Sequence, residues 1–234
     1  MKLSVVIPTL DESNDITGAI LSAAAPEIEL LVVDGGSCDD TVARARATGV
    51  RVDRSERGRA WQLQAGVEAT DGDVVVFLHA DTRLPAAWDA SIRRALETPG
   101  RSGGAFRFYF DDGEAGGRDH HRWCTRLALR IVEVGARLRG ALFELPYGDQ
   151  AIFVRRSVLE AIGGVPLVPM MEDLDLVKAM KKHGRVVILG LPVATSPRRY
   201  LAGGVLRTML RHWFATAAWA FGVDRQRLAE WYGR

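Results

Sequence analysis

The chain has 234 residues, of which 47% are hydrophobic and 26% are charged, and its formal net charge is +2. This balance predicts one globular domain with a full-sized core and excludes a disordered chain. It also argues against a dedicated nucleic-acid binder, because such proteins carry a strong basic surplus.

The first hundred residues alternate between short apolar runs and segments with helical spacing. This alternation predicts an α/β fold, with a mostly parallel sheet and helices on both faces. In such sheets, ligands bind at the carboxyl ends of the strands. The predicted strands are Leu3–Ile7, Glu29–Val33, Val50–Val52 and Val74–Leu78, and the predicted helices lie near Asp15–Ala24, Asp39–Thr48, Arg59–Ala69 and Ala86–Glu97.

Polar residues follow the first two predicted strands. Pro8, Thr9 and Glu12 come after the first strand and could contact a base or a ribose, although polar residues of this turn could instead cap the next helix. Asp34 ends the second strand, before two glycines that let backbone approach a ligand closely. A residue that caps the next helix would come after this turn. Capping therefore does not explain Asp34, and we expect Asp34 to bind a ligand.

Two later loops add a cation and an acid. Arg59 opens a predicted helix after Gly58 and is placed to contact a phosphate, although a surface arginine is the alternative. The fourth strand leads into His79 and Asp81. A carboxylate there can bind Mg²⁺ or Mn²⁺, which in turn bridges phosphate oxygens. A phosphatase of the haloacid dehalogenase type is set aside, because His79 stands where its nucleophilic Asp is needed.

The second half is less regular, and we place a soft boundary between two lobes near residue 99. The expected organisation is a single domain, 1–234, with a first lobe at about 1–98 and a second lobe at about 99–234. The predicted strands are Gly103–Phe110, Ala151–Val154 and Val186–Leu189, and the predicted helices are Trp123–Leu142, Leu174–Lys182 and Val205–Phe221.

Acids and arginines also gather in the second half. Glu172, Asp173 and Asp175 fall within four positions at a helix start, which is more than capping needs, although the helix dipole also favours acids there. Such a carboxylate suits a general base that deprotonates a sugar-acceptor hydroxyl. Arg198 and Arg199 could clamp a leaving diphosphate or lie in a surface turn.

Five segments in order carry a resemblance to a known family: SVVIPTLDES, LLVVDGGSCDDT, GRAWQLQAG, VVVFLHADT and MEDLDL. They resemble the first strand, nucleoside loop, GKxxALNxG segment, DxD metal motif and catalytic Glu-Asp pair of the inverting family 2 glycosyltransferases, which have the GT-A fold. The HADT and GDQ segments are similar to a small bacterial branch labelled rSAM/selenodomain-associated or arsenosugar-biosynthesis glycosyltransferases.

The resemblance implies that the first lobe binds the nucleotide-sugar and the second lobe the acceptor, and it implies a role for each matching residue. Asp173 would be the general base, and Asp81 would bind the divalent metal, Mn²⁺ or Mg²⁺. The other implied roles are nucleotide binding by Pro8, Thr9, Glu12, Asp34 and Arg59, donor-sugar or acceptor contact by Gly148, Asp149, Gln150 and Glu172, and diphosphate binding by Arg198 and Arg199.

Three departures from the family pattern affect these implied roles. His79 replaces the first acid of the DxD motif, which could weaken metal binding. Gly35 replaces a second acid in the nucleoside loop, which leaves Asp34 as the acid that would contact the base. The segment Arg198 to Tyr200 is only a loose counterpart of the family's QxxRW.

We therefore expect a metal-assisted transferase that moves a sugar, with inversion, from a UDP- or GDP-sugar to an unknown acceptor. Direct displacement needs no covalent enzyme intermediate, because the acceptor oxygen attacks as Asp173 takes its proton. One alternative is a nucleotide-sugar-binding protein with weakened catalysis, which His79 favours. A nucleotidyltransferase ranks lower, because the turn from Pro8 to Ser13 has no Gly, Arg or Lys for a triphosphate.

The expected location is the cytoplasm, since the chain begins directly in a strand-like run and its two cysteines have no metal-type spacing. From residue 178 onward basic residues far outnumber the two acids, Asp224 and Glu230. The segments Trp123–Leu142 and Val205–Phe221 combine arginines with apolar residues. Packing inside the domain is the favoured interpretation, and peripheral contact with the inner face of a membrane, with a lipid-linked acceptor, is the alternative.

Overall fold

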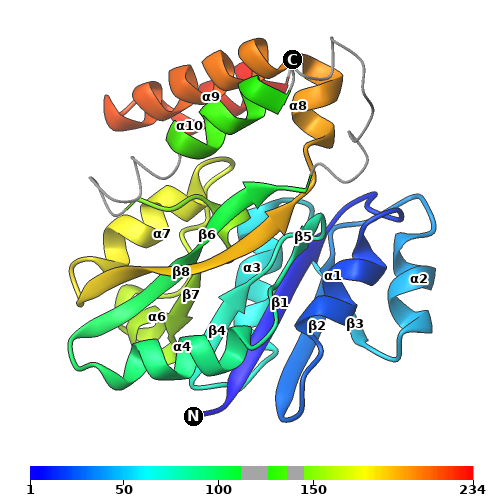
Figure 1. Ribbon diagram of the computed structural model, residues 1–234, viewed down its shortest axis with the longest axis vertical. Helices are drawn as coiled ribbons and strands as arrows, with labels where there is room; N and C mark the ends of the chain where they lie inside the picture. The colour runs from blue at the N-terminus through cyan, green and yellow to red at the C-terminus, as the bar shows by residue number, and fades with distance from the viewer. Residues whose placement is uncertain (112–125, 136–144, 234) are drawn as a thin grey trace.

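An eight-stranded mixed sheet runs through the molecule in the order β3-β2-β1-β4-β7-β6-β8-β5 (Figure 1). The computed structural model describes residues 1–111, 126–135 and 145–233. Strands β3, β2, β1 and β4 are parallel, as are β6 and β8, whereas β7 runs antiparallel to β4 and β6, and β5 to β8. The strands are β1 Leu3–Thr9, β2 Ile28–Asp34, β3 Arg51–Arg54, β4 Val74–Phe77, β5 Thr82–Arg83, β6 Arg101–Phe110, β7 Phe153–Arg155 and β8 Arg185–Thr195.

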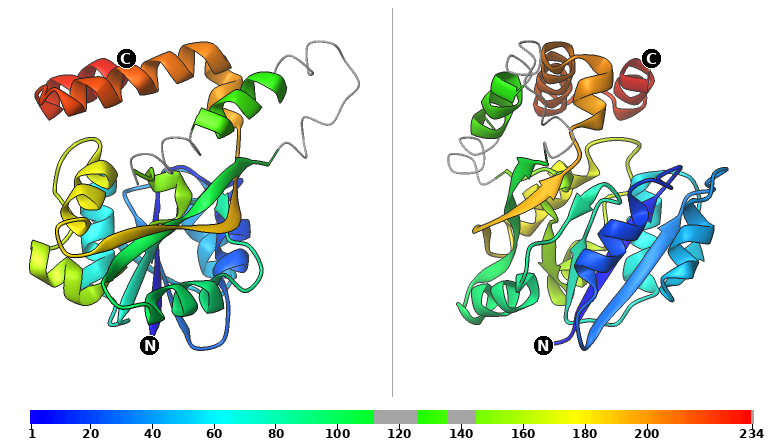
Figure 2. Two further views of the ribbon diagram at one scale, coloured as in Figure 1. Left: turned by 60° about the vertical axis from the view of Figure 1, so that its left-hand side comes forward. Right: turned by 45° about the vertical axis from the view of Figure 1, so that its right-hand side comes forward.

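Helices cover both faces of this sheet and form a further layer beyond one end of it (Figures 1 and 2). Residues 126–135 are also helical. The helices are α1 Ile16–Ala23, α2 Thr41–Ala47, α3 Arg59–Glu68, α4 Trp88–Glu97, α6 Arg156–Ile162, α7 Glu172–Met180, α8 Arg198–Gly203, α9 Val205–Ala220 and α10 Arg225–Gly233, together with the 3-10 turn η2 Gly148–Gln150.

Two apolar clusters, one on each face, bury the central strands completely. Successive strand residues point to opposite faces, so Val5 packs with α1, α2 and α4, while Val6 packs with α3, α6 and α7. Both side chains have no exposed surface. This double coverage explains the continuous apolar runs of β1 and β4.

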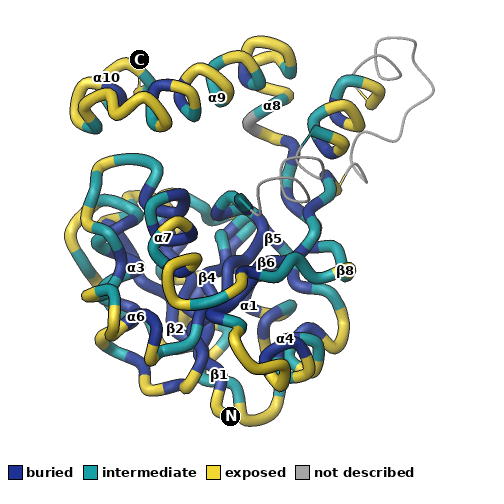
Figure 3. Tube along the Cα trace, turned by 90° about the vertical axis from the view of Figure 1, so that its left-hand side faces the viewer, coloured by how far each residue is buried: buried dark blue, intermediate teal, exposed yellow. Residues whose placement is uncertain are grey.

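The helical layer consists of α8, α9, α10 and the helix at 126–135. It lies beyond the ends of β6 and β8 (Figure 2), and much of its surface is exposed (Figure 3). Its own buried cluster is small, made of Ala215, Ala218 and Leu228 with partly buried Met170, Met171 and Tyr232 against it. No helix in the described part of the chain is both long enough and apolar enough to cross a bilayer.

The predicted α/β architecture is confirmed, and the differences from it are local. Strand β5 and helices α6, α8 and α10 were not predicted, because such short segments carry little periodicity. Strand β8 continues beyond the predicted end at Leu189 through Pro192, where an irregularity between Phe106 and Arg107 of β6 shifts the register. Of the predicted helix Trp123–Leu142, residues 126–135 are helical and the rest lie outside the described residues.

Candidate active site

The loops after β1 and β4 enclose a cavity of about 330 Å³ with the start of α3. We call this cavity the strand-end pocket. Its position follows from the parallel pairing of β1 with β4, which brings the carboxyl ends of both strands to one edge of the sheet. Its lining includes Pro8, Thr9, Glu12, Arg59, Gln62, His79 and Asp81.

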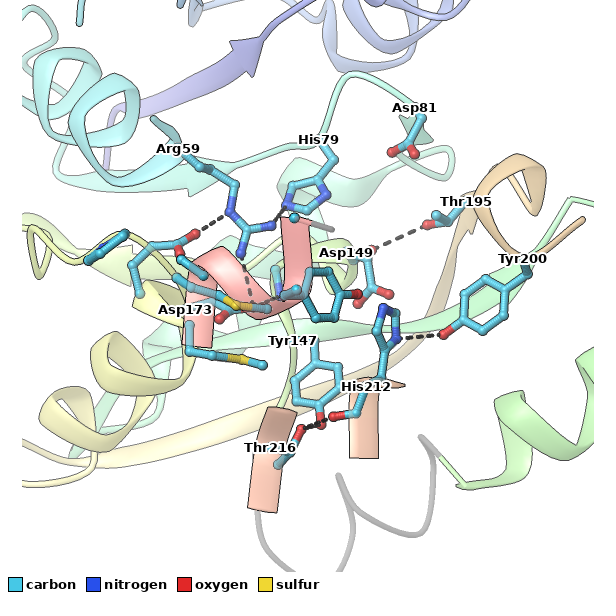
Figure 4. A pocket seen from close by; sticks show the side chains of 18 of the residues that line it. Arg59, His79, Asp81, Tyr147, Asp149, Asp173, Thr195, Tyr200, His212 and Thr216 are labelled. Carbon is cyan, nitrogen blue, oxygen red and sulfur yellow. Dashed lines mark hydrogen bonds and ion pairs between the residues drawn. The ribbon is translucent and has the colours of Figure 1, made fainter. Parts of the chain in front are cut away.

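A second cavity, of about 410 Å³, lies between this edge of the sheet and the helical layer. We call it the roofed pocket, because α8, α9 and α10 contribute its far wall (Figure 4). Its lining on the sheet side includes Gly148, Asp149, Glu172 and Asp173, and on the helical side Tyr200, His212, Thr216 and Tyr232.

Three residues line both cavities: Arg59, His79 and Asp81. Arg59 Nη1 lies 3.2 Å from His79 Nε2. Since a guanidinium can only donate, this contact requires a lone pair on Nε2 of His79. The residue in place of the first DxD acid therefore accepts a hydrogen bond from Arg59.

Arg59 also joins the acid pair at the start of α7. Its Nε donates to Glu172 Oε1, and its Nη2 lies 3.6 Å from Asp173 Oδ2. Burial raises the pKa of Glu172, against the opposing effect of Arg59. Burial lowers the pKa of Arg59, but the attraction of Glu172 and Asp173 outweighs burial, and the net pKa is raised. A fixed positive charge thus stands between the two cavities.

Gly148 lies in direct contact with the carboxylate of Asp173. Its amide donates to Asp173 Oδ2 at 2.7 Å, while Asp173 Oδ1 accepts from the Leu174 amide at 2.9 Å. A Cβ at position 148 would lie 2.8 Å from His79 Nε2 and 3.2 Å from Asp173 Oδ2. The site therefore requires a glycine here for steric reasons rather than for a special backbone angle.

Non-glycine residues with positive φ flank the site. Met171, just before the acid pair, has φ 63°, Ala151, just after η2, has φ 47°, and Asp11, in the loop after β1, has φ 54°. Such backbone is costly and persists where the surrounding structure imposes it. Met171 directly precedes α7, so its strained backbone sets where Glu172 and Asp173 begin the helix.

Asp34 lies at the carboxyl end of β2, but its carboxylate is completely buried. Oδ2 accepts from the Gly36 amide at 3.0 Å, and Oδ1 accepts from the Ser37 amide at 3.0 Å. We expected that capping would not explain Asp34, yet these contacts give it a clear role in shaping its own loop. It lines neither cavity, and its predicted contact with a base stays a prediction.

Glu12 and Arg198, predicted for nucleoside and diphosphate, contact each other. Arg198 Nη2 donates to Glu12 Oε2 at 2.6 Å, and Nη1 lies 3.3 Å from Asp15 Oδ2. Burial raises the pKa of Glu12, with Arg198 opposing the shift. This pairing ties α8 of the helical layer to the loop after β1. The side chain of Arg199 lies outside the described part of the structure.

The other predicted residues divide between lining and support. Asp149 lines the roofed pocket, whereas Gln150 is buried and donates to the Phe106 carbonyl at 2.8 Å. Asp175, the third acid of α7, accepts from Trp219 Nε1 at 2.8 Å and from Arg225 Nη2 at 3.0 Å. Asp175 therefore anchors α9 and α10 to α7 and does not line either cavity.

The chemistry of Asp81 fits a divalent cation held jointly with a substrate. Among the residues that the structure covers, no group of three or more His, Cys, Asp or Glu could hold a metal by itself. Mg²⁺ typically takes one or two carboxylates and completes its shell with water and substrate phosphates. A single acid at the boundary of two cavities matches that arrangement.

Several lining residues were not singled out from the sequence. Gln62 Nε2 donates to the carbonyls of Thr9 and Val33, both at 2.8 Å, and so ties α3 to the carboxyl ends of β1 and β2. A polar residue on the buried face of an amphipathic helix could have marked it. Tyr147 and His212 had no such signal, because only the tertiary fold brings their segments together.

Comparison with known proteins gives a family and a fold. The family model described as "Glycosyl transferase family 2" matches residues 4–163. Glucosyl-3-phosphoglycerate synthase of Mycolicibacterium paratuberculosis is 38% identical over 97 residues, which cover 36% of this chain and 29% of that protein. The counterpart in Mycobacterium tuberculosis is 37% identical over 97 residues, covering 36% and 30%. The matched part is thus less than a third of these relatives' length.

Solved structures resemble the chain over most of its length. The M. tuberculosis glucosyl-3-phosphoglycerate synthase in complex with Mn²⁺, UDP-glucose and phosphoglyceric acid has a TM-score of 0.62 at 23% identity, covering 93% of this chain and 78% of that one. A structure described as a mycobacterial protein has a TM-score of 0.64 at 24% identity, covering 93% and 74%. At this identity the likeness confirms the GT-A fold.

Proposed function

The chain belongs to glycosyl transferase family 2, and we propose that it moves a sugar from a nucleotide diphosphate-sugar to an acceptor hydroxyl with inversion. The observation that carries this proposal is the pair of adjoining cavities that share Arg59, His79 and Asp81. A donor spanning this shared wall would place its nucleotide in one cavity and its sugar toward the acid pair in the other.

The donor is a UDP-sugar in this proposal, which is supported by the UDP-glucose complex of the structural neighbour. Pro8, Thr9, Glu12 and Arg59 would contact the nucleotide, since all four line the strand-end pocket. Asp34 would support nucleotide binding indirectly, because its carboxylate fixes the backbone of the loop after β2. Every lining residue of this pocket precedes residue 98, which supports the division into a nucleotide-sugar-binding lobe and an acceptor lobe.

Asp81 would hold Mn²⁺ or Mg²⁺ together with the diphosphate oxygens. Both ions occur in complexes of the neighbouring enzyme. When bound, the ion supplies positive charge to the leaving group. Arg59 stands at the same boundary and would add a fixed cation, and Arg198 and Arg199 would do so from α8.

Asp173 is the general base of the proposed reaction. It takes the proton of the acceptor hydroxyl while that oxygen bonds to the anomeric carbon and the bond from carbon to diphosphate breaks on the opposite side. The Gly148 amide, the Leu174 amide and Arg59 fix the orientation of its carboxylate. Gly148, Asp149 and Glu172 line the space for the donor sugar and acceptor, and Gln150 supports that wall.

A thermal-shift experiment tests the donor and the metal of the proposed function. UDP, GDP, UDP-glucose and GDP-mannose would be added with and without Mn²⁺, because a ligand specific for the folded state raises the midpoint of unfolding. We expect a Mn²⁺-dependent shift with a uridine ligand, lost in Asp81→Asn but kept in Asp40→Asn, an exposed control. Absence of a shift with every nucleotide would refute the donor assignment.

A nucleotide-sugar-binding protein without catalysis is the second candidate, and His79 in the metal motif favours it. Release of UDP from bound UDP-glucose separates the two. Continued turnover supports the enzyme, whereas tight donor binding with no release, even with excess Mn²⁺, supports the binding protein.

The bacterial branch labelled rSAM/selenodomain-associated or arsenosugar-biosynthesis, the cytoplasmic location and a lipid-linked acceptor are finer parts of the proposal. The helical layer supports peripheral membrane contact, because exposed arginines accompany an apolar stripe along α9. Arg207 and Arg227 are exposed on this layer. The stripe consists of Leu206, Leu210, Trp213 and Phe214 of α9 and of Phe221 directly after the helix, which are 54–89% exposed.

Co-sedimentation with vesicles tests the membrane contact. We expect binding to vesicles that contain phosphatidylglycerol, and weaker binding after replacement of Trp213 and Phe221 by alanine. Equal recovery in the supernatant with and without anionic vesicles would contradict it and leave the transferase proposal intact.

A further inference from the structure

Five of the rings that line the roofed pocket form what we call the ring wall: Phe110, Tyr147, Tyr200, His212 and Tyr232. Four of them form a continuous chain of contacts. Phe110 meets Tyr200 edge-to-face at 4.9 Å, Tyr200 meets His212 at 5.6 Å, and His212 stacks on Tyr232 at 5.8 Å. These rings come from β6, α8, α9 and α10, so only the folded helical layer assembles them.

The polar groups of the ring wall are neutral hydroxyls and an imidazole. The Tyr147 hydroxyl lies 2.7 Å from Thr216 Oγ1, and the Tyr200 hydroxyl lies 3.0 Å from His212 Nδ1 (Figure 4). Ligand sites commonly combine aromatic walls with a few polar groups that fix orientation. Hydroxyl groups that both donate and accept are suited to the hydroxyls of a neutral ligand.

The charges that line the roofed pocket are mainly negative. Among its described lining residues, the carboxylates are Asp81, Asp149, Glu172 and Asp173, and the one arginine is Arg59. That arginine already pairs with Glu172 and lies close to Asp173. Since Asp81 would hold the metal and Glu172 pairs with Arg59, Asp149 and Asp173 are the acids that a phosphate or carboxylate on the acceptor would meet. Such like charges disfavour its binding.

The ring wall is also joined to the proposed base through the chain itself. Tyr147 directly precedes Gly148, whose amide is held by Asp173. Tyr147 is fixed in turn by Thr216 of α9. A ligand ring packed on this wall therefore lies in the same cavity as the carboxylate that would take its proton.

We propose that the acceptor is a neutral hydroxyl compound with a ring face, such as a sugar or an aryl glycoside. This inference rests on the proposed function. It sets the chain apart from the mycobacterial structural neighbour, whose complex contains phosphoglyceric acid.

The test measures UDP release from UDP-glucose and Mn²⁺ with three probes at equal concentration: 4-nitrophenyl β-glucoside, 3-phosphoglycerate, and vesicles that contain a glucosyl diacylglycerol. We expect a neutral glucoside to accelerate release at least about tenfold more than 3-phosphoglycerate does. The soluble and vesicle probes separate a free acceptor from a lipid headgroup. Acceleration by 3-phosphoglycerate alone, or by no neutral probe in a protein that binds donor, overturns the inference.

Two variants keep the test independent of folding. Tyr200→Ala should lower kcat/KM for the glucoside about three- to tenfold by removing one ring contact surface. Leu201→Ala on the same helix should not, because Leu201 is exposed and lines neither cavity. Equal loss in both would contradict the role of the ring wall. Failure of the donor to bind the wild-type protein would instead refute the proposed function.

Discussion

The strand-end pocket and the helical layer of the roofed pocket are built in different ways. The first is formed by loops at the ends of strands that are buried on both faces, and Gln62 ties α3 to the ends of β1 and β2. The second rests on its own small apolar cluster, on a few side chains that reach the main core, such as Leu129 and Tyr200, and on the polar contacts of Asp175 and Arg198. The proposed donor side is therefore set by the core, whereas the proposed acceptor side depends on fewer contacts, which single substitutions can remove.

The difference gives each cavity a distinct response to mutation. Changes at the shared wall should affect chemistry most, because Arg59, Glu172 and Asp173 lie where the two parts meet. Changes within the helical layer should affect acceptor use and stability while donor affinity stays close to that of the wild type.

The largest expected effect is that of Asp173→Asn. Removing the proton acceptor should lower kcat by about 10²- to 10⁴-fold, while the Mn²⁺-dependent thermal shift with UDP stays. Steady-state UDP release with an acceptor measures this effect, with Asp89→Asn on α4 as a control distant from both cavities. Wild-type transfer rates in Asp173→Asn would refute the general-base assignment.

The next effect is that of Gly148→Ala, which places a methyl group against His79 and Asp173. Misplacing these groups should lower kcat/KM about 100-fold, and overpacking should reduce the free energy of unfolding by about 1–3 kcal/mol. In Gly190→Ala, the matched control, the added Cβ meets nothing within 4 Å. Equal kcat/KM values for the two variants would show that His79 and Asp173 can move without loss of activity, which would contradict this prediction.

A smaller effect should follow from loosening the helical layer. Trp219→Phe removes the 2.8 Å hydrogen bond to Asp175 and should lower the free energy of unfolding by about 1 kcal/mol. Trp213→Phe is the control, since Trp213 is 64% exposed. Urea unfolding measures the stability, and KM for UDP-glucose should not change. A large rise in that KM would break the distinction between the two regions.

The smallest effect concerns pH. Burial raises the pKa of Glu172 in the folded state, so its protonated form contributes stability that is present below the unfolded pKa and is lost as pH rises through the folded pKa. The unfolding free energy of wild type relative to Glu172→Gln should therefore fall as pH rises from 4 to 7. Urea unfolding across this range measures it, with exposed Glu160→Gln as the control. A difference that rises with pH would contradict the stated direction.

The sequence by itself determined that the first half alternates strands and helices in a mostly parallel sheet, and it predicted that ligands bind at the carboxyl ends of these strands. Continuous β-branched runs such as Val74–Phe77 can be buried only between two helical layers, and this constraint is local. The same pattern placed Asp81 and the acid pair Glu172 and Asp173 at element ends. The site roles themselves stay predictions that the experiments above test.

The tertiary structure alone decided which of these ends face one another. Asp34 and Asp175 were as prominent in the sequence as Asp173, yet one shapes its own loop and the other anchors the helical layer. The ring wall had no sequence signal, because its members come from four elements and the segment before η2, which are separated along the chain. Hydrophobic periodicity reports what each segment buries, whereas a site depends on distances between segments, and those are fixed only when the whole core is packed.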